Sequence, residues 1–427
     1  MESLYLINHK IKDFGGFAGE HSVNLNPTEP SVILGVNGTG KTSLLKSFYA
    51  SCMMLVFNER GNNWGFLGLT VPNVNNDSQD LTVESLFQYI SNFKSNRVNT
   101  GVTIDDSGNP KFLHDRSNTD KLFREISKDK HNPMPVLRLF TAEKNVDNRK
   151  LVVTQTTIDL SRRNQGYHEA DANHFVTDLI TQFFMQQINI ENQEKVDKGD
   201  LGHETKIGKY LRTTLKTFVE ELYEGEIEIK TGASKYSKGQ SLMLTVDDKQ
   251  LEYIQLSSGE KYVISMVLEI AYRNVVLNSD ISDLNIASGI IMIDEIESHL
   301  HPRWQLNIID ALTTTFPKMQ FIVSTHSPLV ASTVYKDQLV VLDDFQIIDN
   351  DTIPNLYSGS ADELLKNILH ADNRLDDYEE EQNQINILIN EKKFGEADEK
   401  LKALKDKVKA SPKWLTNIER KLNFVKA

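Results

Sequence analysis

The sequence predicts an α/β protein with a mainly parallel sheet, and three apolar stretches carry that prediction. Residues 31–34, 289–293 and 320–323 are runs that favour buried strands, and each is followed by polar residues. Strands that are apolar throughout are typical of parallel sheets covered on both faces. Because ligands bind at the carboxyl ends of such strands, the polar residues that follow are the candidate functional residues.

The first of these polar stretches, residues 35–42, has the spacing Gly-x-x-x-x-Gly-Lys-Thr and precedes an apolar helix. Glycines let the backbone wrap around a phosphate chain, and N–H groups at a helix N-terminus attract its negative charge. The spacing predicts that Lys41 reaches the β- and γ-phosphates of ATP and that Thr42 binds Mg²⁺. A glycine-rich turn without a ligand is the alternative, which this strand–loop–helix context disfavours. The expected nucleotide-binding residues are Gly35, Asn37, Gly38, Thr39, Gly40, Lys41, Thr42 and Ser43.

Composition narrows the class of protein. Of 427 residues, 39% are hydrophobic and 25% charged, as in a large globular chain, and the net charge is −13 with a pI near 5.4. This acidic balance disfavours a general binder of nucleic-acid backbone, although a local basic face remains compatible with it. A single cysteine, Cys52, excludes an internal disulfide. With no apolar run of membrane-spanning length, the expected location is the cytoplasm.

The order of patterns divides the chain into four expected parts. Residues 1–55 open an ATPase head with strands at 3–9 and 21–25, and residues 251–345 complete it. Residues 56–250 form an insertion, and residues 346–427 form a helical tail. Within the insertion we expect a helix at 83–93, a core strand at 135–141, a helical arm of two helices (170–189 and 204–223) joined by the polar segment 191–200, and strands at 226–230 and 241–246. A further strand is expected at 251–254, where the second part of the head begins.

Four cations share one face of the second arm helix, at spacings of three, three and four: Lys206, Lys209, Arg212 and Lys216. A solvated helix face is the favoured interpretation. The alternative is a contact stripe for nucleic acid or an acidic partner.

A second anion-binding pattern stands at Leu256-Ser257-Ser258-Gly259-Glu260, immediately before an apolar helix. Hydroxyls, N–H groups and the helix dipole together attract an anion at such a place, although an ordinary helix cap would look the same. The five residues resemble the signature motif of ATP-binding-cassette ATPases, with Ser258 in place of the first glycine and Glu260 in place of glutamine. The resemblance implies nucleotide contacts from Ser257, Ser258, Gly259 and Glu260.

The remaining motifs follow in the order of the same family. Asp294 and Glu295 end an apolar strand, and the resemblance implies that Asp294 holds Mg²⁺ while Glu295 orients the attacking water. His326, after the next strand, is similar to the switch histidine that bonds the γ-phosphate. His299 and His301 also suggest a metal site, but a loop facing a partner subunit explains them adequately. The expected catalytic residues are Glu295, His326 and Lys41, and the expected metal ligands are Thr42 and Asp294.

The resemblance covers residues 1–55 and about 250–345, and it implies a homodimer in which Ser257 and Gly259 of one chain complete the ATP site of the other. The glutamine that senses Mg²⁺ in this family is unplaced, with Gln155 as a weak candidate. The pairing of Ile293–Pro302 with Ser324–Pro328 resembles the bacterial ATPases of the overcoming-lysogenisation-defect and Septu type, some of which act beside a retron.

That resemblance implies a regulatory ATPase that controls a separate effector, a nuclease or a toxin. We expect no nuclease on the same chain, because residues 345–427 are expected to form no acidic Asp-x-Asp strand ending suited to two metals. The alternatives are a DNA-maintenance ATPase that acts directly on DNA and, less favoured, the ATPase subunit of a transporter.

Overall fold

The computed structural model divides the chain into two compact units, Met1–Ala361 and Asp362–Ala427. We describe each unit by itself. The residues that the structure describes are 3–56, 80–91, 94–105, 110–114, 129–141, 166–167, 177–223, 227–235, 240–246, 249–349, 376–408 and 418–422.

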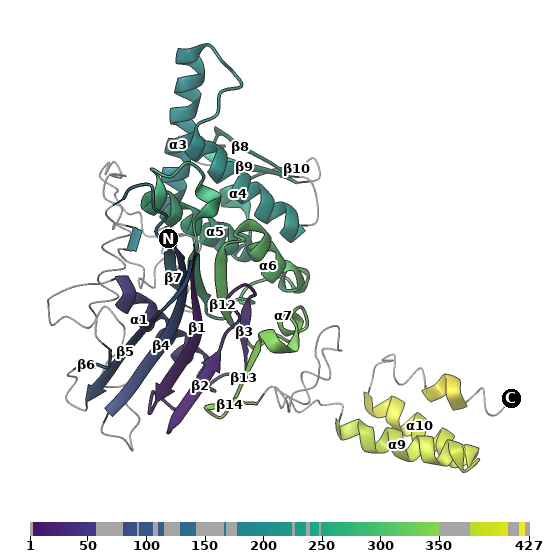
Figure 1. Cartoon of the computed structure of the whole chain (residues 1–427). Coiled ribbons are helices and arrows are strands. Elements are labelled where there is room, and N and C mark those ends of the chain that lie inside the picture. The colour runs from purple at the N-terminus through teal and green to yellow at the C-terminus, as the bar shows by residue number, and fades with distance from the viewer. Residues whose placement is uncertain are drawn as a thin grey trace. The chain divides into compact units, whose positions relative to one another are not determined.

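A six-stranded sheet forms the centre of the first unit (Figure 1). Five neighbouring strands pair in parallel, and β14 pairs antiparallel at one edge. The three predicted apolar strands are all present and fully buried, which confirms the expected fold class. In spatial order the strands are β14 (Gln346–Ile348), β13 (Leu339–Asp343), β3 (Ser31–Leu34), β12 (Met319–Thr325), β11 (Gly289–Ile293) and β7 (Val136–Phe140).

A second sheet is antiparallel and takes up both the N-terminal strands and part of the insertion. The helix expected at residues 83–93 is wrong: residues 80–91 are a strand, while 92 and 93 lie outside the described residues. The reason is a period of two, because Leu81, Val83, Ser85 and Phe87 are buried in alternation on one face. In spatial order the strands are β2 (Glu20–Asn24), β1 (Ser3–Lys12), β4 (Asp80–Ser91), β5 (Lys94–Asp105) and β6 (Pro110–Phe112).

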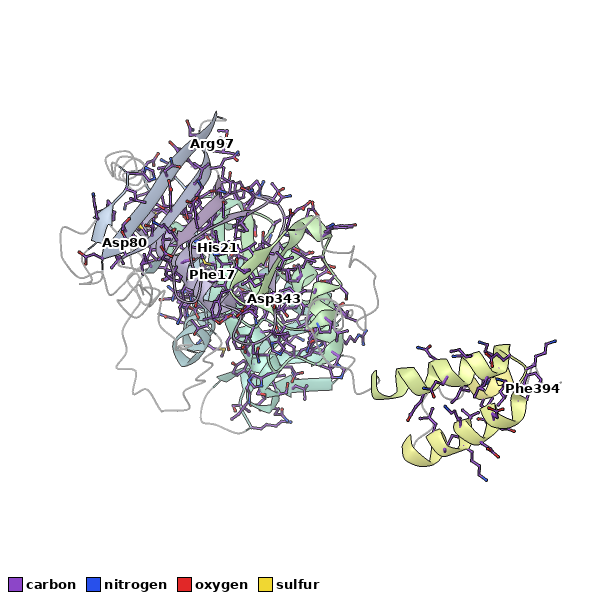
Figure 2. The ribbon with its side chains drawn as sticks, turned by 90° about the horizontal axis from the view of Figure 1, so that it is seen from below. Phe17, His21, Asp80, Arg97, Asp343 and Phe394 are labelled. Carbon is purple, nitrogen blue, oxygen red and sulfur yellow. The ribbon has the colours of Figure 1, made fainter. Side chains whose placement is uncertain are left out.

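Helix α1 (Lys41–Val56) begins at the end of the phosphate loop and lies between the two sheets. It contacts β4 and β5 on one side and β7, β11 and β12 on the other. Most of its residues are buried, and Cys52 is among them, as its apolar surroundings in the sequence predict. Seen from below, Phe17 and His21 lie together near Asp343 at the end of β13 (Figure 2).

Five further α-helices of the first unit lie in the described residues; the shortest is α7 (Pro328–Ala331), and another, α5 (Ser258–Asn278), contacts β7 of the parallel sheet. The arm helices α3 (Thr177–Lys198) and α4 (Lys206–Tyr223) both contact α5, and α4 also packs on α6 (Pro302–Thr315). The prediction of a polar connection at 191–200 is wrong for most of its length, because the helix continues through 198. Its charged residues there pair at a spacing of four. Residues 170–176 of the expected first helix lie outside the described residues.

A small antiparallel sheet stands beside the arm, in the order β10 (Lys249–Glu252), β9 (Gln240–Val246) and β8 (Ile227–Ala233). In the second unit, α9 (Asp376–Asn390) and α10 (Phe394–Val408) pack together around a core that includes Ile389, Leu401 and Leu422. Within the described part of the chain, no helix combines the length and the apolar character that crossing a membrane requires.

Candidate functional site: a phosphate loop, its acidic partners and a second helix N-terminus

The phosphate loop joins β3 to α1, and its lysine lies folded against it. The Lys41 Nζ donates hydrogen bonds to the carbonyls of Gly35 (2.9 Å) and Val36 (2.8 Å), and the Thr39 hydroxyl donates to Val36 O (2.9 Å). Asn37 and Gly38 are exposed at the turn. The amine is thus bonded to carbonyls of its own loop, and its contact with the β- and γ-phosphates stays a prediction.

Glycine is required in this loop for two separate reasons. Gly38 and Gly40 have φ of +88° and +98°, a region that side chains disfavour. A β-carbon on Gly35 would lie 2.6 Å from Leu342 O, and one on Gly40 would lie 2.7 Å from the ring of Phe17. The spacing read from the sequence therefore reflects backbone geometry in the folded chain.

The Lys41 ammonium lies in a mixed electrostatic environment. Burial lowers its pKa, and the nearby carboxylates of Asp294, Glu297 and Glu295 oppose that effect, with Asp294 the strongest. The phosphate loop and these three carboxylates, which are about 250 positions apart in the sequence, therefore lie close together at this amine. The predicted phosphate-binding and acidic residues form one site.

Asp294 is the centre of the acidic side and is almost fully buried. Its Oδ2 accepts a hydrogen bond from the Thr42 hydroxyl at 2.7 Å, and its Oδ1 accepts one from the Ser324 hydroxyl. Because β12 lies between β3 and β11, Ser324 at the end of β12 spans the space between the phosphate-loop strand and the Asp294 strand. Sequence reasoning missed Ser324, although its place at the end of an apolar strand was a usable signal.

The donor set at this point fits Mg²⁺. A hydroxyl and a carboxylate, both hard oxygen ligands, lie side by side where a triphosphate on the loop would supply the remaining oxygens. Within the described residues, no group of three or more His, Cys, Asp and Glu side chains could hold a metal by itself. The residues thus fit a cation that is shared with a nucleotide.

Glu295 follows in a strained backbone conformation, with φ of +48°. Its N–H donates to Ser324 Oγ (2.9 Å), and its Oε2 accepts from the Ser298 hydroxyl (3.1 Å). The carboxylate is half-buried. This position beside Asp294 is compatible with the predicted role of orienting a water molecule.

His326 lies after β12, and its partner is a residue that sequence reasoning missed. The Glu297 Oε1 lies 2.7 Å from His326 Nδ1 and also accepts the His326 N–H at 2.7 Å. Glu297 is 5% exposed, whereas the His326 side chain is 44% exposed. A third acidic residue two positions after Glu295 was the available signal, but only the fold brings it to His326.

The signature residues form a capped helix start. Ser257 is the N-cap of α5: its Oγ accepts from Glu260 N (3.3 Å), and its N–H donates to Glu260 Oε2 (2.6 Å). The Tyr223 hydroxyl, at the end of α4, donates to Glu260 Oε1 (2.5 Å). Ser257 and Ser258 are exposed. Both interpretations of the motif are compatible with this geometry, because a good cap also presents N–H groups to an anion.

Gly259 has a close neighbour within its own chain. A β-carbon there would lie 2.2 Å from the carbonyl oxygen of His299. The start of α5 therefore packs against the loop 296–301 that follows Glu295. In this loop His301 caps α6 by accepting from Arg303 N, which accounts for that histidine without a metal.

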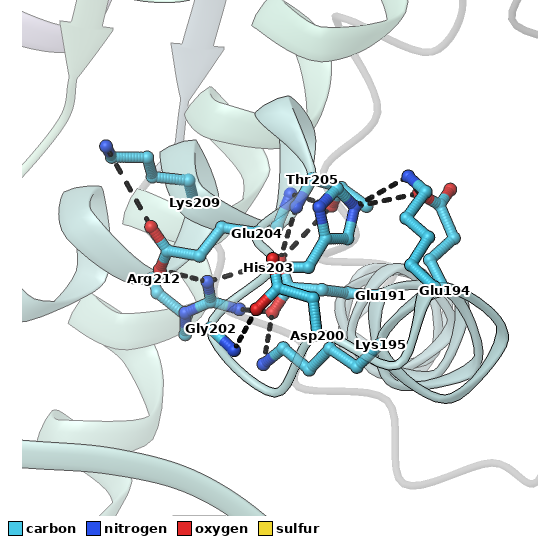
Figure 3. Close-up of polar contacts among 12 residues, drawn as sticks. Glu191, Glu194, Lys195, Asp200, Gly202, His203, Glu204, Thr205, Lys209 and Arg212 are labelled. Atoms are coloured by element: carbon cyan, nitrogen blue, oxygen red, sulfur yellow. Dashed lines mark hydrogen bonds and ion pairs between the residues drawn. The ribbon is translucent and has the colours of Figure 1, made fainter.

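The four cations of the arm are engaged within the chain, and Figure 3 draws the contacts of Lys209 and Arg212. Arg212 pairs with Glu191 (2.6 Å) and Glu204 (2.7 Å), and Lys206 Nζ donates to Ile281 O (2.8 Å). Lys209 and Lys216 lie 3.9 Å and 3.6 Å from Glu204 and Glu220. These contacts favour the solvated, internally paired face over a contact stripe. Gln155 lies outside the described residues.

The chain is similar in sequence to a known protein family and to several named proteins. A family model described as "AAA domain, putative AbiEii toxin, Type IV TA system" matches residues 31–332, more than half of the chain. The chain is 26% identical over 373 residues to the "Retron Vc95 probable ATPase" of Vibrio cholerae serotype O1 biovar El Tor, covering 74% of this chain and 69% of that protein.

Two further relatives match over shorter segments. The "Retron Ec83 probable ATPase" of Escherichia coli is 42% identical over 101 residues, which cover 24% of this chain and 19% of that protein. The "Septu protein PtuA" of Bacillus thuringiensis is 30% identical over 145 residues, which cover 31% and 35%. In both cases the match spans well under two thirds of the relative.

Among solved structures, an SMC head bound to the C-terminal winged-helix domain of ScpA has a TM-score of 0.46 and 13% identity, covering 81% of this chain and 97% of that one. A structure of the "recombination mediator protein RecF-ATPrS in RecFOR pathway" has a TM-score of 0.41 and 12% identity, covering 81% of this chain and 98% of that one.

Proposed function

We propose a function from the family to which this chain belongs: it is a member of the AAA-domain family matched over residues 31–332, and a P-loop ATPase. Within that family we propose that two copies close around two molecules of Mg²⁺-ATP in the cytoplasm. The closed dimer controls a separate effector protein, a nuclease or toxin, in a defence system of the retron or Septu kind.

The roles of the residues follow from the contacts of the site. Lys41 and the loop N–H groups bind the phosphates, and Thr42 and Asp294 hold Mg²⁺, which neutralises charge on the β- and γ-phosphate oxygens. Glu295 orients the attacking water from its fixed place beside Ser324. Catalysis of this kind depends on positioning and charge stabilisation, so no covalent nucleophile is needed.

The proposal of a dimer is supported by one observation: the predicted nucleotide-binding residues form two groups, one around the buried Lys41 and one at an exposed helix start. Lys41 and Asp294 are buried together, whereas Ser257 and Ser258 stand exposed at a capped helix N-terminus that packs on the 296–301 loop. An exposed hydroxyl pair at a helix N-terminus suits an anion that arrives from outside the subunit. We infer that this anion is the γ-phosphate of ATP on a second copy.

Mixing two inactive variants tests the shared site. Lys41→Ala removes the phosphate-binding amine, and Ser257→Asp keeps a good N-cap while placing a negative charge against the phosphate. A mixed dimer has one site with both defects and one site with neither. We expect each variant alone to lack ATP hydrolysis and the mixture to recover a substantial part of the wild-type rate.

No recovery in the mixture, with both variants folded, would mean that each subunit completes its own site. Glu295→Gln supplies an independent measure, because it should bind ATP without turnover and accumulate as a dimer in light scattering. A Glu295→Gln protein that remains monomeric at saturating ATP would contradict the proposal.

The defence role rests on the named relatives, two described as retron ATPases and one as a Septu protein. The test is a plaque assay in cells carrying the chain with its flanking genes. We expect protection to be lost with Lys41→Ala. Unchanged protection would remove the ATPase from the pathway.

The alternative is an ATPase that acts directly on DNA. The net charge of −13 and the paired arm cations favour the effector-controlling role instead. A gel shift separates the two, because tight ATP-dependent binding of duplex DNA by the isolated chain would favour direct action on DNA.

A further inference from the structure

Glu297 is a buried carboxylate that accepts hydrogen bonds from two consecutive residues, Thr325 and His326. Its Oε2 accepts from the Thr325 hydroxyl at 2.7 Å, and its Oε1 accepts from the His326 N–H at 2.7 Å. The same Oε1 lies 2.7 Å from His326 Nδ1. A carboxylate that is 5% exposed needs such donors, because an unpaired buried charge is costly.

The ion-pair distance of 2.7 Å to Nδ1 places the imidazole beside the carboxylate. An ionised carboxylate only accepts hydrogen bonds, so the nitrogen that faces it carries the hydrogen. This holds whether the ring is neutral or charged, because both forms can have Nδ1–H. The other nitrogen, Nε2, is then directed away from Glu297 on a ring that is 44% exposed.

Glu297 also belongs to the loop that carries Glu295. The Ile296 N–H donates to Ser324 O (3.1 Å), which ties the loop to the end of β12 just before Glu297, and the Leu300 N–H donates to Glu297 O (3.0 Å) within the loop. One side chain therefore joins the segment after Asp294 and Glu295 to the segment that holds His326.

We propose that Glu297 is a positioning residue, which holds His326 with Nδ1–H directed at its own carboxylate and so presents Nε2 to the terminal phosphate of the nucleotide. The identity of the phosphate as the partner of Nε2 rests on the proposed function. The contact between Glu297 and His326, and its effect on the ring, do not.

The first test is the tautomer of His326 in the nucleotide-free full chain, read from ¹⁵N chemical shifts after selective histidine labelling. The His326→Gln variant assigns the signal. We expect Nδ1–H in the wild type and a shift to mainly Nε2–H in Glu297→Ala, since nothing then selects the less favoured tautomer. Glu297→Gln keeps an acceptor oxygen and should retain Nδ1–H.

A matched control separates positioning from stability. Glu191 is also a buried carboxylate that accepts a backbone N–H and a hydroxyl, both from Thr205. Glu191→Ala should lower the melting temperature without changing the His326 signal. If Glu297→Ala leaves the Nδ1–H signal in place, the proposal is overturned.

The second test is a double-mutant cycle on ATP hydrolysis. We expect Glu297→Ala to lower kcat by about 10- to 100-fold, as misplacement of a reacting group does, with little change in KM. In a His326→Gln background the same substitution should cost no more than about 2-fold, because its target is gone. Glu297→Gln should recover most of kcat.

Additive losses would mean that Glu297 acts independently of His326, which contradicts the proposal. Should the wild type prove unable to hydrolyse ATP, the proposed function fails while the tautomer experiment still decides the role of Glu297. Should Glu297→Ala fail to fold, Glu297→Asp, whose shorter side chain withdraws the carboxylate from Nδ1, replaces it in both tests.

Discussion

Substituting Gly259 by alanine tests the packing between the start of α5 and the loop after Glu295. The new β-carbon would lie 2.2 Å from His299 O, where ordinary contact begins at 3.4 Å, so the two segments must separate by about 1.2 Å. Overpacking of this kind costs about 1–3 kcal/mol, and alanine regains up to about 1 kcal/mol of helix propensity. We expect a net loss of about 1 kcal/mol.

Gly395→Ala is the matched control, because Gly395 is likewise the second residue of its helix and nothing lies within 4 Å of its β-carbon position. That variant should gain roughly 0.5–1 kcal/mol. Amide hydrogen exchange without nucleotide measures both, since it reports local opening near 256–301 and 394–408 separately.

Whether Gly259→Ala is destabilised or stabilised tests the packing of α5 on the loop 296–301. Faster exchange in the loop 296–301 of Gly259→Ala confirms the contact within one subunit, and a displacement of this size near Glu295 should also lower kcat, by up to about 100-fold. If Gly259→Ala is stabilised as Gly395→Ala is, with unchanged exchange in 296–301, the inferred packing is wrong.

Three further substitutions address other contacts. Burial lowers the pKa of His9 to about 3, so between about pH 6.5 and 3 the unfolded chain binds a proton that the folded chain does not. The free energy of unfolding should therefore decrease as the pH is lowered through that window, by up to about 1.4 kcal/mol per pH unit, and His9→Gln should flatten this dependence in denaturation curves. Tyr223→Phe removes the hydrogen bond to Glu260 of α5 and should weaken ATP-dependent dimerisation. Tyr253→Phe removes a hydrogen bond to Ser265, also in α5, and should not weaken it, so equal dimerisation of the two variants in light scattering would contradict this prediction. Glu269→Ala leaves Arg138 and Arg273 buried without their shared carboxylate and should cost about 3–5 kcal/mol in thermal unfolding, and a loss below 1 kcal/mol would show that the network relaxes.

The parts of the site that were predictable from sequence are those in which one short segment carries the physics. The loop 35–42 needs glycines because of its own backbone angles, and the strands before Asp294 and His326 are apolar because both of their faces are covered. Such constraints leave a local pattern that can be read without the fold.

The parts that sequence reasoning missed depend on residues distant in the chain. Ser324 is 30 residues from Asp294, and Tyr223 is 37 residues from Glu260. No period or spacing encodes these contacts, because the order of strands and the packing of α4 create them. The erroneous helix at 83–93 has a different cause: an alternation of buried residues that includes Ser85 was hidden by the polar identity of that position.

The enclosure of α1 bears on how the molecule responds to ligand. Because α1 packs against strands of both sheets, tilting it would disrupt the packing of one sheet or the other. We therefore expect the N-terminus of α1, at the phosphate loop, to keep its position within the subunit. His9, hydrogen-bonded to Ser47 of α1 and Ser85 of β4, fastens it further. We therefore expect motion during turnover in the opposite half, where α4 packs against both α5 and α6.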